Sequence, residues 1–315
     1  MSEKDIAITV VMAVYNPPID WFKELLESLA MQDFSDVEWL IIDDASDKIS
    51  ISELTDLIKD CTAFQEKKIP FKIWRNNKNI GSDQTYRKLM AFAEGEYIAF
   101  CDQDDIWEEN KLSRLYEEIV KHKGVLAYAD MSVIDSKGVQ IKESYHDKRK
   151  IFGHISGEER TAELLTRNCA PGCNILVKKE VIRQYKNIPQ GTYWDHWLNI
   201  IASTQGKIIF IPEKLMRYRI HGTNQTGRFN NIFDKNDYYK YRLKPLYDRM
   251  IEMKKREIHF LNEEKVYRFI KARYNKNLYD MWKYRSCGKV DAYFEIFLIL
   301  LPKCIIKKVF KWIKK

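Results

Sequence analysis

The chain has 315 residues, of which 45% are hydrophobic and 31% charged, and its twelve glycines and eight prolines are too few for a disordered or fibrous protein. The formal net charge is +8, but residues 291–315 alone contribute +4, from six lysines against Asp291 and Glu295. The basic charge therefore gathers at the C-terminal end, which argues against a nucleic-acid groove. The six cysteines are too scattered for a disulfide framework and include no C-x-x-C pair, at positions 61, 101, 169, 173, 287 and 304.

The amino terminus predicts a cytoplasmic protein. It enters a strand-like run at residues 6–14 without the basic start, apolar stretch and cleavage site of a signal peptide. Cys169 and Cys173 lie four positions apart and would need His196 and His221 to complete a zinc site, a poor spacing. Buried reduced thiols are the simpler interpretation.

The first 123 residues alternate apolar runs with amphipathic segments. A run typical of a strand buried on both faces occupies residues 6–14 and a second apolar run occupies 37–42; a short strand is indicated at 71–74 and a fourth at 97–101. Helices are indicated by Phe22, Leu25, Leu26 and Leu29, by residues 52–64 and 84–93, and by Trp107, Leu112, Leu115 and Ile119. Gly95 is expected to end the third helix. This alternation predicts a mainly parallel sheet flanked by helices, with ligands at the carboxyl ends of its strands.

The pattern changes beyond Gly124. Strands are indicated at residues 125–134, 175–177 and 208–211, with a hairpin turn at 135–138, and helices at 158–167 and from Tyr193. These strands predict an antiparallel extension of the sheet. From about residue 232 the chain is rich in lysine and aromatic residues and is expected to be mostly helical.

Three carboxylates crowd directly after the strand at 97–101. Repulsion among Asp102, Asp104 and Asp105 would raise their pKa values unless a cation compensates. Hard oxygen ligands suit Mg²⁺ or Mn²⁺, which keep open positions for phosphate oxygens. The alternative is that these aspartates cap a helix beginning near Ile106.

A second acidic pair, Asp43 and Asp44, ends the strand at 37–42 and is expected at the same edge of the sheet. A carboxylate there can accept the imide N–H of a uracil or thymine ring, and Tyr15 can stack on such a base. The alternative is a solvated turn, with Tyr15 as an aromatic residue at a strand end.

Together these stretches resemble family 2 glycosyltransferases of the GT-A fold. The matching stretches are residues 10–16 (VVMAVYN), 41–47 (IIDDASD), 79–81 (NIG), 95–98 (GEYI) and 101–107 (CDQDDIW). They follow the family's order and spacing, and the resemblance covers roughly residues 6–225. It implies an α/β nucleotide-diphospho-sugar transferase fold in residues 1–230, divided into a nucleotide-sugar half (6–123) and an acceptor half (124–230). Residues 231–315 would form a helical extension with a basic amphipathic tail.

By this resemblance, Tyr15 and Asp44 hold the pyrimidine, Asp102 reaches the ribose, and Asp104 binds the Mn²⁺ or Mg²⁺ that bridges the diphosphate. One position departs from the pattern: many relatives carry an arginine in the helix after residues 79–81, whereas this chain has Tyr86 with Arg87 beside it. Arg87 is accordingly a weaker candidate for a nucleotide contact.

The resemblance also implies which residues bind the acceptor and remove its proton. Asp195, in the segment 193–197 (YWDHW), would be the base that removes the acceptor's proton, flanked by Trp194 and His196. An N-cap is the alternative for Asp195. The loop at 168–174 resembles the acceptor loop, in which Gly172 and Cys173 would approach a sugar; an ordinary surface turn is the alternative.

Residues 215–224 (LMRYRIHGTN) resemble a segment of rhamnosyltransferase-like members, in which His221 would approach the metal or diphosphate. A structural histidine is the alternative. The implied activity is inverting transfer from a nucleotide sugar, with dTDP-rhamnose favoured, to a glycan or lipid-linked glycan in surface polysaccharide synthesis. The alternatives are a UDP-hexose or UDP-N-acetylhexosamine donor, or a catalytically idle nucleotide-sugar binder.

The C-terminal tail, residues 294–315, alternates apolar runs with lysines and is too short in its apolar part to span a bilayer. Its aromatic and basic composition predicts peripheral binding to the inner face of a membrane. A helix packed on the catalytic domain is the alternative.

Overall fold

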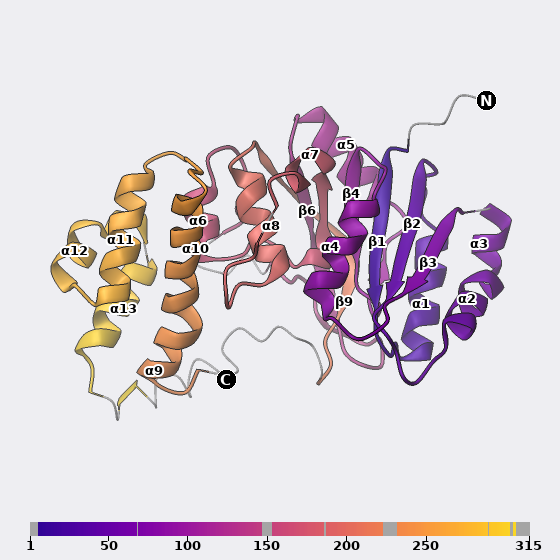
Figure 1. Cartoon of the computed structure of the whole chain (residues 1–315), viewed down its shortest axis with the longest axis horizontal. Coiled ribbons are helices and arrows are strands. Elements are labelled where there is room, and N and C mark those ends of the chain that lie inside the picture. The colour runs from indigo at the N-terminus through magenta and orange to yellow at the C-terminus, as the bar shows by residue number, and fades with distance from the viewer. Residues whose placement is uncertain are drawn as a thin grey trace.

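The computed structural model describes residues 6–67, 69–146, 153–185, 187–222, 232–288, 290–302 and 305–306. One twisted sheet runs through the first two thirds of the chain, with helices on both of its faces, and a group of helices lies beyond one end (Figure 1). The strand order is β3-β2-β1-β4-β8-β6-β9-β5, with β7 paired to β6.

The parallel part of the sheet is the one expected. Its strands are β1 (Ile8–Val14), β2 (Val37–Asp43), β3 (Phe71–Arg75) and β4 (Tyr97–Cys101), all paired in parallel. Residues alternate between its two faces, so Val10 and Met12 join a core with α1 (Ile19–Ala30), whereas Val11 and Ile98 join a core with α4 (Ser82–Phe92). Burial on both faces explains why β1, β2 and β4 are mostly apolar runs, whereas β3, at the edge of the sheet, is only partly buried.

Two helix expectations need correction. The helix expected at 52–64 is two helices, α2 (Ile51–Asp60) and α3 (Thr62–Lys67), because the backbone at Cys61 is extended. Gly95 does not end α4, which stops at Phe92. A Cβ at Gly95 would lie 2.6 Å from the backbone nitrogen of Thr9, so glycine is needed for close approach to β1.

The segment after the aspartates also differs from the expectation. Ile106 and Trp107 form β5 (Ile106–Trp107), antiparallel to β9 (Ile208–Arg219), and the helix α5 (Lys111–Lys121) starts only afterwards. The N-cap of α5 is Asn110, without a side-chain cap bond. In the described structure the three aspartates therefore do not cap this helix, and their side chains point to other partners.

The second half of the sheet is mixed. β8 (Ile175–Lys178) is antiparallel to both β4 and β6 (Leu126–Ile134), and β6 forms the expected hairpin with β7 (Gln140–Lys142). β9, however, runs parallel to β6 and is longer than expected. This extension carries Arg219 and the following His221 to the sheet edge where β4 ends.

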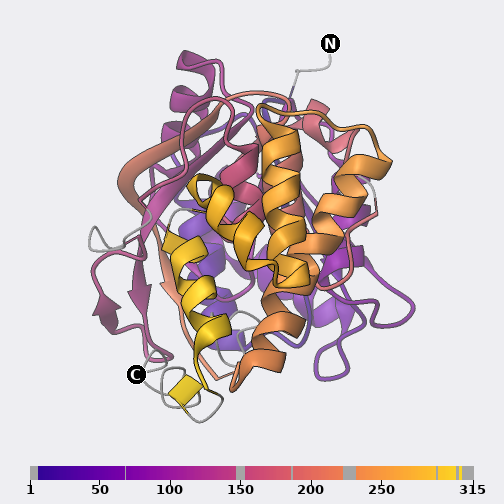
Figure 2. The ribbon, with the colours of Figure 1, turned by 90° about the vertical axis from the view of Figure 1, so that its left-hand side faces the viewer.

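The remaining helices of the sheet region are α6 (Thr161–Thr166), the 3₁₀ turn η1 (Gly172–Asn174), α7 (Lys179–Ile182) and α8 (Trp194–Ser203). The C-terminal group comprises α9 (Lys235–Tyr238), the π-helical turn η2 (Tyr239–Leu243), α10 (Lys244–Lys255), α11 (Glu263–Asn275), α12 (Leu278–Lys283), the 3₁₀ turn η3 (Arg285–Cys287) and α13 (Val290–Leu300). Figure 2 looks onto this group. No helix within the described ranges combines the length and the apolar character that crossing a bilayer requires.

Candidate active site

The loops after β1 and β4 are joined by one side chain. Gln103 accepts a hydrogen bond from the backbone N–H of Tyr15 at 2.8 Å and donates its amide to the Tyr15 carbonyl at 3.0 Å. The Tyr15 ring itself is 45% exposed. The backbone is thus fixed while the ring stays open to solvent at the predicted base-binding edge.

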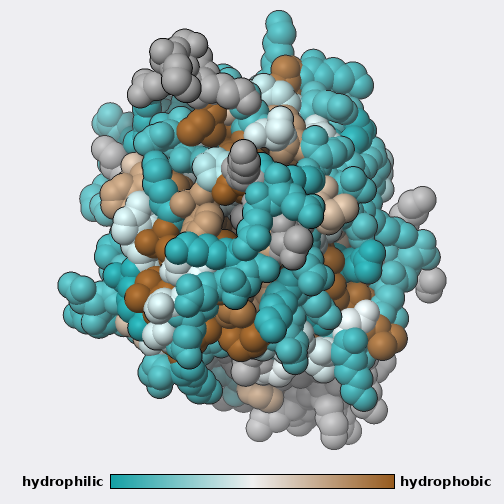
Figure 3. All heavy atoms as spheres, turned by 90° about the vertical axis from the view of Figure 1, so that its right-hand side faces the viewer, coloured by the Kyte–Doolittle hydropathy of each residue, from teal (hydrophilic) through white to brown (hydrophobic). Residues whose placement is uncertain are grey.

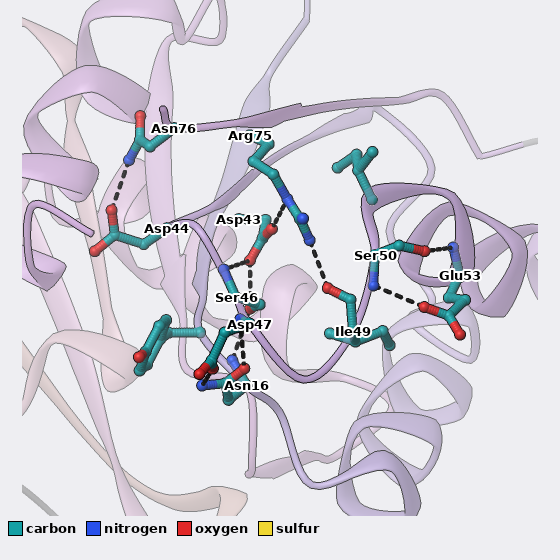
Figure 4. A network of polar contacts seen from close by, with 12 residues as sticks. Asn16, Asp43, Asp44, Ser46, Asp47, Ile49, Ser50, Glu53, Arg75 and Asn76 are labelled. Carbon is teal, nitrogen blue, oxygen red and sulfur yellow. Dashed lines mark hydrogen bonds and ion pairs between the residues drawn. The ribbon is translucent and has the colours of Figure 1, made fainter. Parts of the chain in front are cut away.

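The two neighbouring aspartates after β2 have different hydrogen-bond partners (Figure 4). Asp43 is buried and accepts hydrogen bonds from the hydroxyl and backbone N–H of Ser46, and it pairs with Arg75. Asn16, at φ 44°, donates its amide to Asp47 at 2.6 Å and ties the loop after β1 to the loop after β2. Asp43 therefore shapes the turn.

Asp44 points away from Asp43, toward Asn76 (Figure 4). It is buried, and its carboxylate accepts hydrogen bonds from Asn76 at 2.8 Å, from Ile80 N–H at 3.0 Å and from Gly81 N–H at 2.8 Å. A carboxylate offers about four acceptor positions, so about one remains, on Oδ2. The solvated-turn alternative is wrong for this pair because both carboxylates are buried.

The three carboxylates after β4 diverge to three partners. Asp102 accepts a hydrogen bond from the Tyr86 hydroxyl at 3.0 Å. Asp104 lies 2.6 Å from Nε2 of His221. Asp105 is fully buried and accepts from the backbone N–H of Arg219 at 2.9 Å. Each carboxylate is therefore oriented separately, by α4 or by the end of β9.

Arg219 holds this loop against the sheet. Its side chain is buried, donates to the Asp104 carbonyl at 2.8 Å and pairs with Glu24 of α1, and its guanidinium lies 5.1 Å from the ring centroid of Trp21. A planar guanidinium can donate to several acceptors at fixed angles, so one arginine can hold the loop, α1 and β9 together.

A second buried cation lies behind the carboxylates. Lys111 of α5 is 1% exposed, donates to the carbonyl of Cys173 at 2.8 Å, and sits 3.7 Å from the ring centroid of Trp107. Burial lowers the pKa of Lys111 to about 8, and the charges of nearby groups including Asp105 and Asp102 oppose that shift. Lys111 therefore supplies positive charge where the buried carboxylates need it.

Two groups of side chains are candidates for a metal site. Ligand atoms of Asp102, Asp105 and Cys173 lie within 4.8 Å of one another. The Cys173 thiol and the Asp105 carboxylate, however, are fully buried and closed to a phosphate from solvent, and a thiol is a soft ligand for Mg²⁺ or Mn²⁺. The pair Asp104 and His221 is partly exposed, at 16% and 14% of the side chain. A carboxylate and an imidazole with access to solvent fit Mn²⁺ better.

Asp195 is the buried carboxylate on the acceptor side. It lies in the first turn of α8, after the N-cap Tyr193, and accepts from Gly172 N–H at 3.1 Å and from the Asn168 amide at 3.1 Å. Burial raises the pKa of Asp195 to about 6; the His196 N–H lowers it, and the charge of Asp102 raises it further. The N-cap alternative is wrong, since Tyr193 occupies that position.

Packed aromatic rings lie between Asp195 and the carboxylates after β4. The ring of Trp194 packs 4.5 Å from that of Tyr86 and 4.8 Å from that of Phe100. A Cβ at Gly172 would lie 2.3 Å from Cζ2 of Trp194. Glycine is thus required by the indole ring, whereas the sequence suggested that a sugar would approach the backbone here.

Two predicted acceptor contacts are not placed for that role. Cys173 is fully buried beside Asp102 and Asp105. His196 donates Nε2–H to the Leu164 carbonyl at 2.6 Å, in the contact between α8 and α6, and burial lowers its pKa to about 3. Both side chains face the protein interior because η1 and the first turn of α8 turn them inward.

Arg87 lies beside Tyr185. Its guanidinium is 5.7 Å from the ring centroid of Tyr185, whose hydroxyl donates to the Trp194 carbonyl at 3.3 Å. It is Tyr86 that reaches Asp102, so the phenol stands where the resemblance expects an arginine. The departure at residue 86 was the signal available in the sequence for Tyr86. Gln103 and Arg219 lie inside the motifs at 101–107 and 215–224, which gave no role to either, and Lys111 carried no signal.

Comparison with known proteins identifies related chains. The model of the family "Glycosyl transferase family 2" matches residues 9–186. An uncharacterized glycosyltransferase of Methanocaldococcus jannaschii is 26% identical over 75% of this chain and 78% of its own length. The dTDP-rhamnosyl transferase RfbG of Shigella flexneri is 26% identical over 69% and 73%, and the UDP-Glc:alpha-D-GlcNAc-diphosphoundecaprenol beta-1,3-glucosyltransferase WfgD of Escherichia coli is 23% identical over 69% and 78%. In a longer relative from Rickettsia felis, the match spans only 35% of that protein.

Solved structures share the fold at low identity. S. aureus TarS 1–349 in complex with UDP-GlcNAc has a TM-score of 0.59 at 16% identity, covering 86% of this chain and 73% of its own. The mannosyltransferase PcManGT from Pyrobaculum calidifontis, in complex with GDP-Man and Mn²⁺, has a TM-score of 0.54 at 13% identity, covering 90% and 74%. The expected GT-A architecture is confirmed by these likenesses.

Proposed function

Since this chain belongs to glycosyl transferase family 2 and has the GT-A fold, we propose that it moves a sugar from a nucleoside diphosphate to a glycan or lipid-linked glycan acceptor in surface polysaccharide synthesis. The observation that carries the proposal is the contact between Asp104 and His221 at the carboxyl edge of the sheet. Asp102 and Tyr86 connect that edge through Trp194 to Asp195. We assign residues 1–230 to catalysis and residues 231–315 to a separate helical part.

On the donor side, Tyr15 and the remaining acceptor position of Asp44 would bind the pyrimidine, and Asp102 the ribose. Asp104 and His221 would hold Mn²⁺ or Mg²⁺. Such an ion, when bound, offsets the negative charge that develops on the departing diphosphate. A solved relative of the fold contains Mn²⁺, which supports this choice.

On the acceptor side, Asp195 would take the proton from the attacking hydroxyl. The acceptor oxygen forms a bond to the anomeric carbon as the bond from that carbon to the phosphate oxygen breaks, and the electron pair leaves with the nucleoside diphosphate. A single displacement of this kind inverts the anomeric centre. A buried carboxylate whose pKa is raised to about 6 is suited to this proton transfer.

We favour dTDP-rhamnose as the donor because of the segment around His221 and the similarity to RfbG. UDP-glucose or UDP-N-acetylhexosamine is the alternative, which the similarity to WfgD and TarS supports. A catalytically idle binder would not require the oriented Asp195.

We propose a cytoplasmic location, in keeping with the free cysteines among the described residues. We also propose that the tail at 294–315 binds the membrane; the structure describes its residues 294–302, 305 and 306, and the other half lies outside the described residues.

The test is a thermal-shift screen of dTDP-rhamnose, UDP-glucose, UDP-N-acetylglucosamine and the free nucleotides, with and without Mn²⁺. A ligand at about 100 times its Kd stabilises the folded state by about 2.7 kcal/mol. We expect one donor to raise the melting temperature only when Mn²⁺ is present. The same donor should then release its nucleoside diphosphate when an acceptor is added. Binding without turnover on any glycan acceptor would favour the idle binder instead.

A further inference from the structure

The outer side of α12 and α13 carries an apolar surface, here called the aromatic face. It consists of Tyr279, Trp282, Tyr293, Phe297 and Leu300, each more than half exposed. Tyr293, Phe297 and Leu300 follow one another at four and three positions and so share one side of α13. The rings of Trp282 and Tyr293 meet edge to face with centroids 6.2 Å apart, which joins the two helices into one surface.

The outward direction of this face is set by the opposite side of α13. Glu295 is buried there in an ion pair with Arg273 of α11 and accepts a hydrogen bond from the Tyr238 hydroxyl at 2.7 Å. Ala292 and Leu298 are buried on the same side. Rotating α13 to hide its exposed aromatic residues would expose this ion pair and its partners, so the face is held in solvent. In Figure 2, α13 lies in yellow at the surface of this end of the molecule.

Charge distinguishes this end from the rest of the protein. Of residues 232–315, those that the structure describes contain 15 Lys and Arg against 10 Asp and Glu, a net charge of +5, whereas residues 1–231 carry −4. The Arg285 guanidinium lies 4.5 Å from the ring centroid of Trp282, and Lys235 donates to the Ile299 carbonyl at 2.9 Å. The opposite end of the molecule shows a mainly hydrophilic surface with separate small apolar patches (Figure 3).

We propose that the aromatic face binds the surface of an anionic phospholipid membrane, with its rings at the level of the headgroups and the surrounding Lys and Arg at the phosphates. This inference rests on the proposed lipid-linked acceptor, which such docking would bring within reach of the active site. A second copy is the poorer occupant, because a symmetric pair would place two surfaces of net positive charge against each other.

The experiment is co-sedimentation of the full chain with vesicles of phosphatidylglycerol and phosphatidylethanolamine, and with phosphatidylcholine alone, in the absence of any nucleotide sugar. The test variant is Phe297→Glu. The matched control is Phe92→Glu, because Phe92 is 54% exposed on α4 and Phe297 is 56% exposed. We expect preferential binding to the anionic vesicles, weakened about tenfold or more in Phe297→Glu and unchanged in Phe92→Glu. An unchanged melting temperature would show that Phe297→Glu still folds.

Three outcomes would overturn the inference. The first is equal binding of the wild-type chain to both kinds of vesicle. The second is a concentration-dependent dimer in sedimentation velocity that Phe297→Glu abolishes, which would assign the face to a second copy. The third is vesicle binding that survives Phe297→Glu but is lost on deleting residues 303–315, which would assign binding to those residues alone. Because no sugar donor is present, none of these results depends on whether the proposed transfer reaction is correct.

Discussion

His221 Nε2 lies 2.6 Å from Asp104 Oδ2, although 117 positions separate the two residues in the chain. β9 makes this contact possible, because it runs beside β6, pairs with β5 and ends next to the loop that carries Asp104. A carboxylate and an imidazole within reach of one ion form the part of the site that we propose to hold Mn²⁺ or Mg²⁺.

Removing the imidazole tests that pair. For His221→Ala we expect Mn²⁺ affinity, measured by calorimetry, to fall by at least about tenfold, because one of two proposed protein ligands is lost. His122→Ala is the matched control, since His122 pairs with Glu118 on the outer side of α5. Equal Mn²⁺ affinity in the two variants would refute the assignment of His221 as a ligand.

Replacing Asp195 tests the proposed base. Asp195→Asn keeps the size of the side chain but cannot accept a proton, so kcat should fall by about 10²- to 10⁴-fold. Donor binding, measured by thermal shift, should be retained. The control is Asp56→Asn, an exposed position on α2. Full turnover by Asp195→Asn would remove this residue from the mechanism.

The raised pKa of Asp195 predicts a pH dependence of both rate and stability. The base acts only when ionised, so kcat/KM should rise as the pH passes through about 6. The folded-state pKa lies above the ordinary value of 3.8, so the protonated form is favoured by folding, and this contribution to stability is lost as the pH rises from about 4 through 6. Asp195→Asn should therefore melt no lower than the wild type at pH 7.5; a clearly lower melting temperature would contradict the desolvation argument.

Lys111→Met tests the cation behind the carboxylates. It leaves Asp102 and Asp105 without that buried positive charge, which should lower the free energy of unfolding by about 3–5 kcal/mol in urea titrations. Lys121→Met, on the same helix but exposed, is the control and should change stability by less than about 0.5 kcal/mol. Similar stability in the two variants would mean that Lys111 does not offset the carboxylates.

Tyr86→Phe removes the hydroxyl beside Asp102 and leaves the ring against Trp194. A hydrogen bond to a charged group contributes about 1.5–3 kcal/mol to stability, so the free energy of unfolding should fall by about that amount, and the KM for the donor should rise because Asp102 is no longer held in place. Tyr267→Phe is the control, because the buried Tyr267 hydroxyl has no hydrogen-bond partner in the described ranges. An unchanged KM in Tyr86→Phe would show that the orientation of Asp102 does not depend on this phenol.

The sequence alone determined the parallel half of the fold and the edge at which the acidic residues gather. β1, β2 and β4 are buried on both faces, so they appear as continuous apolar runs, and the polar residues that follow them mark their carboxyl ends. The resemblance added Asp195 and His221, which no local periodicity indicates.

Only the tertiary structure decided which residues each of these side chains contacts. The parallel pairing of β9 with β6 brings Arg219 and His221 to the aspartates. The antiparallel pairing of β9 with Ile106 and Trp107 makes these two residues a strand where a helix was expected. The inward turn of Cys173 and His196 likewise follows from packing around η1 and α8. Local patterns encode the period of a strand or helix, whereas contacts between residues a hundred positions apart depend on strand order and packing, which no short segment contains.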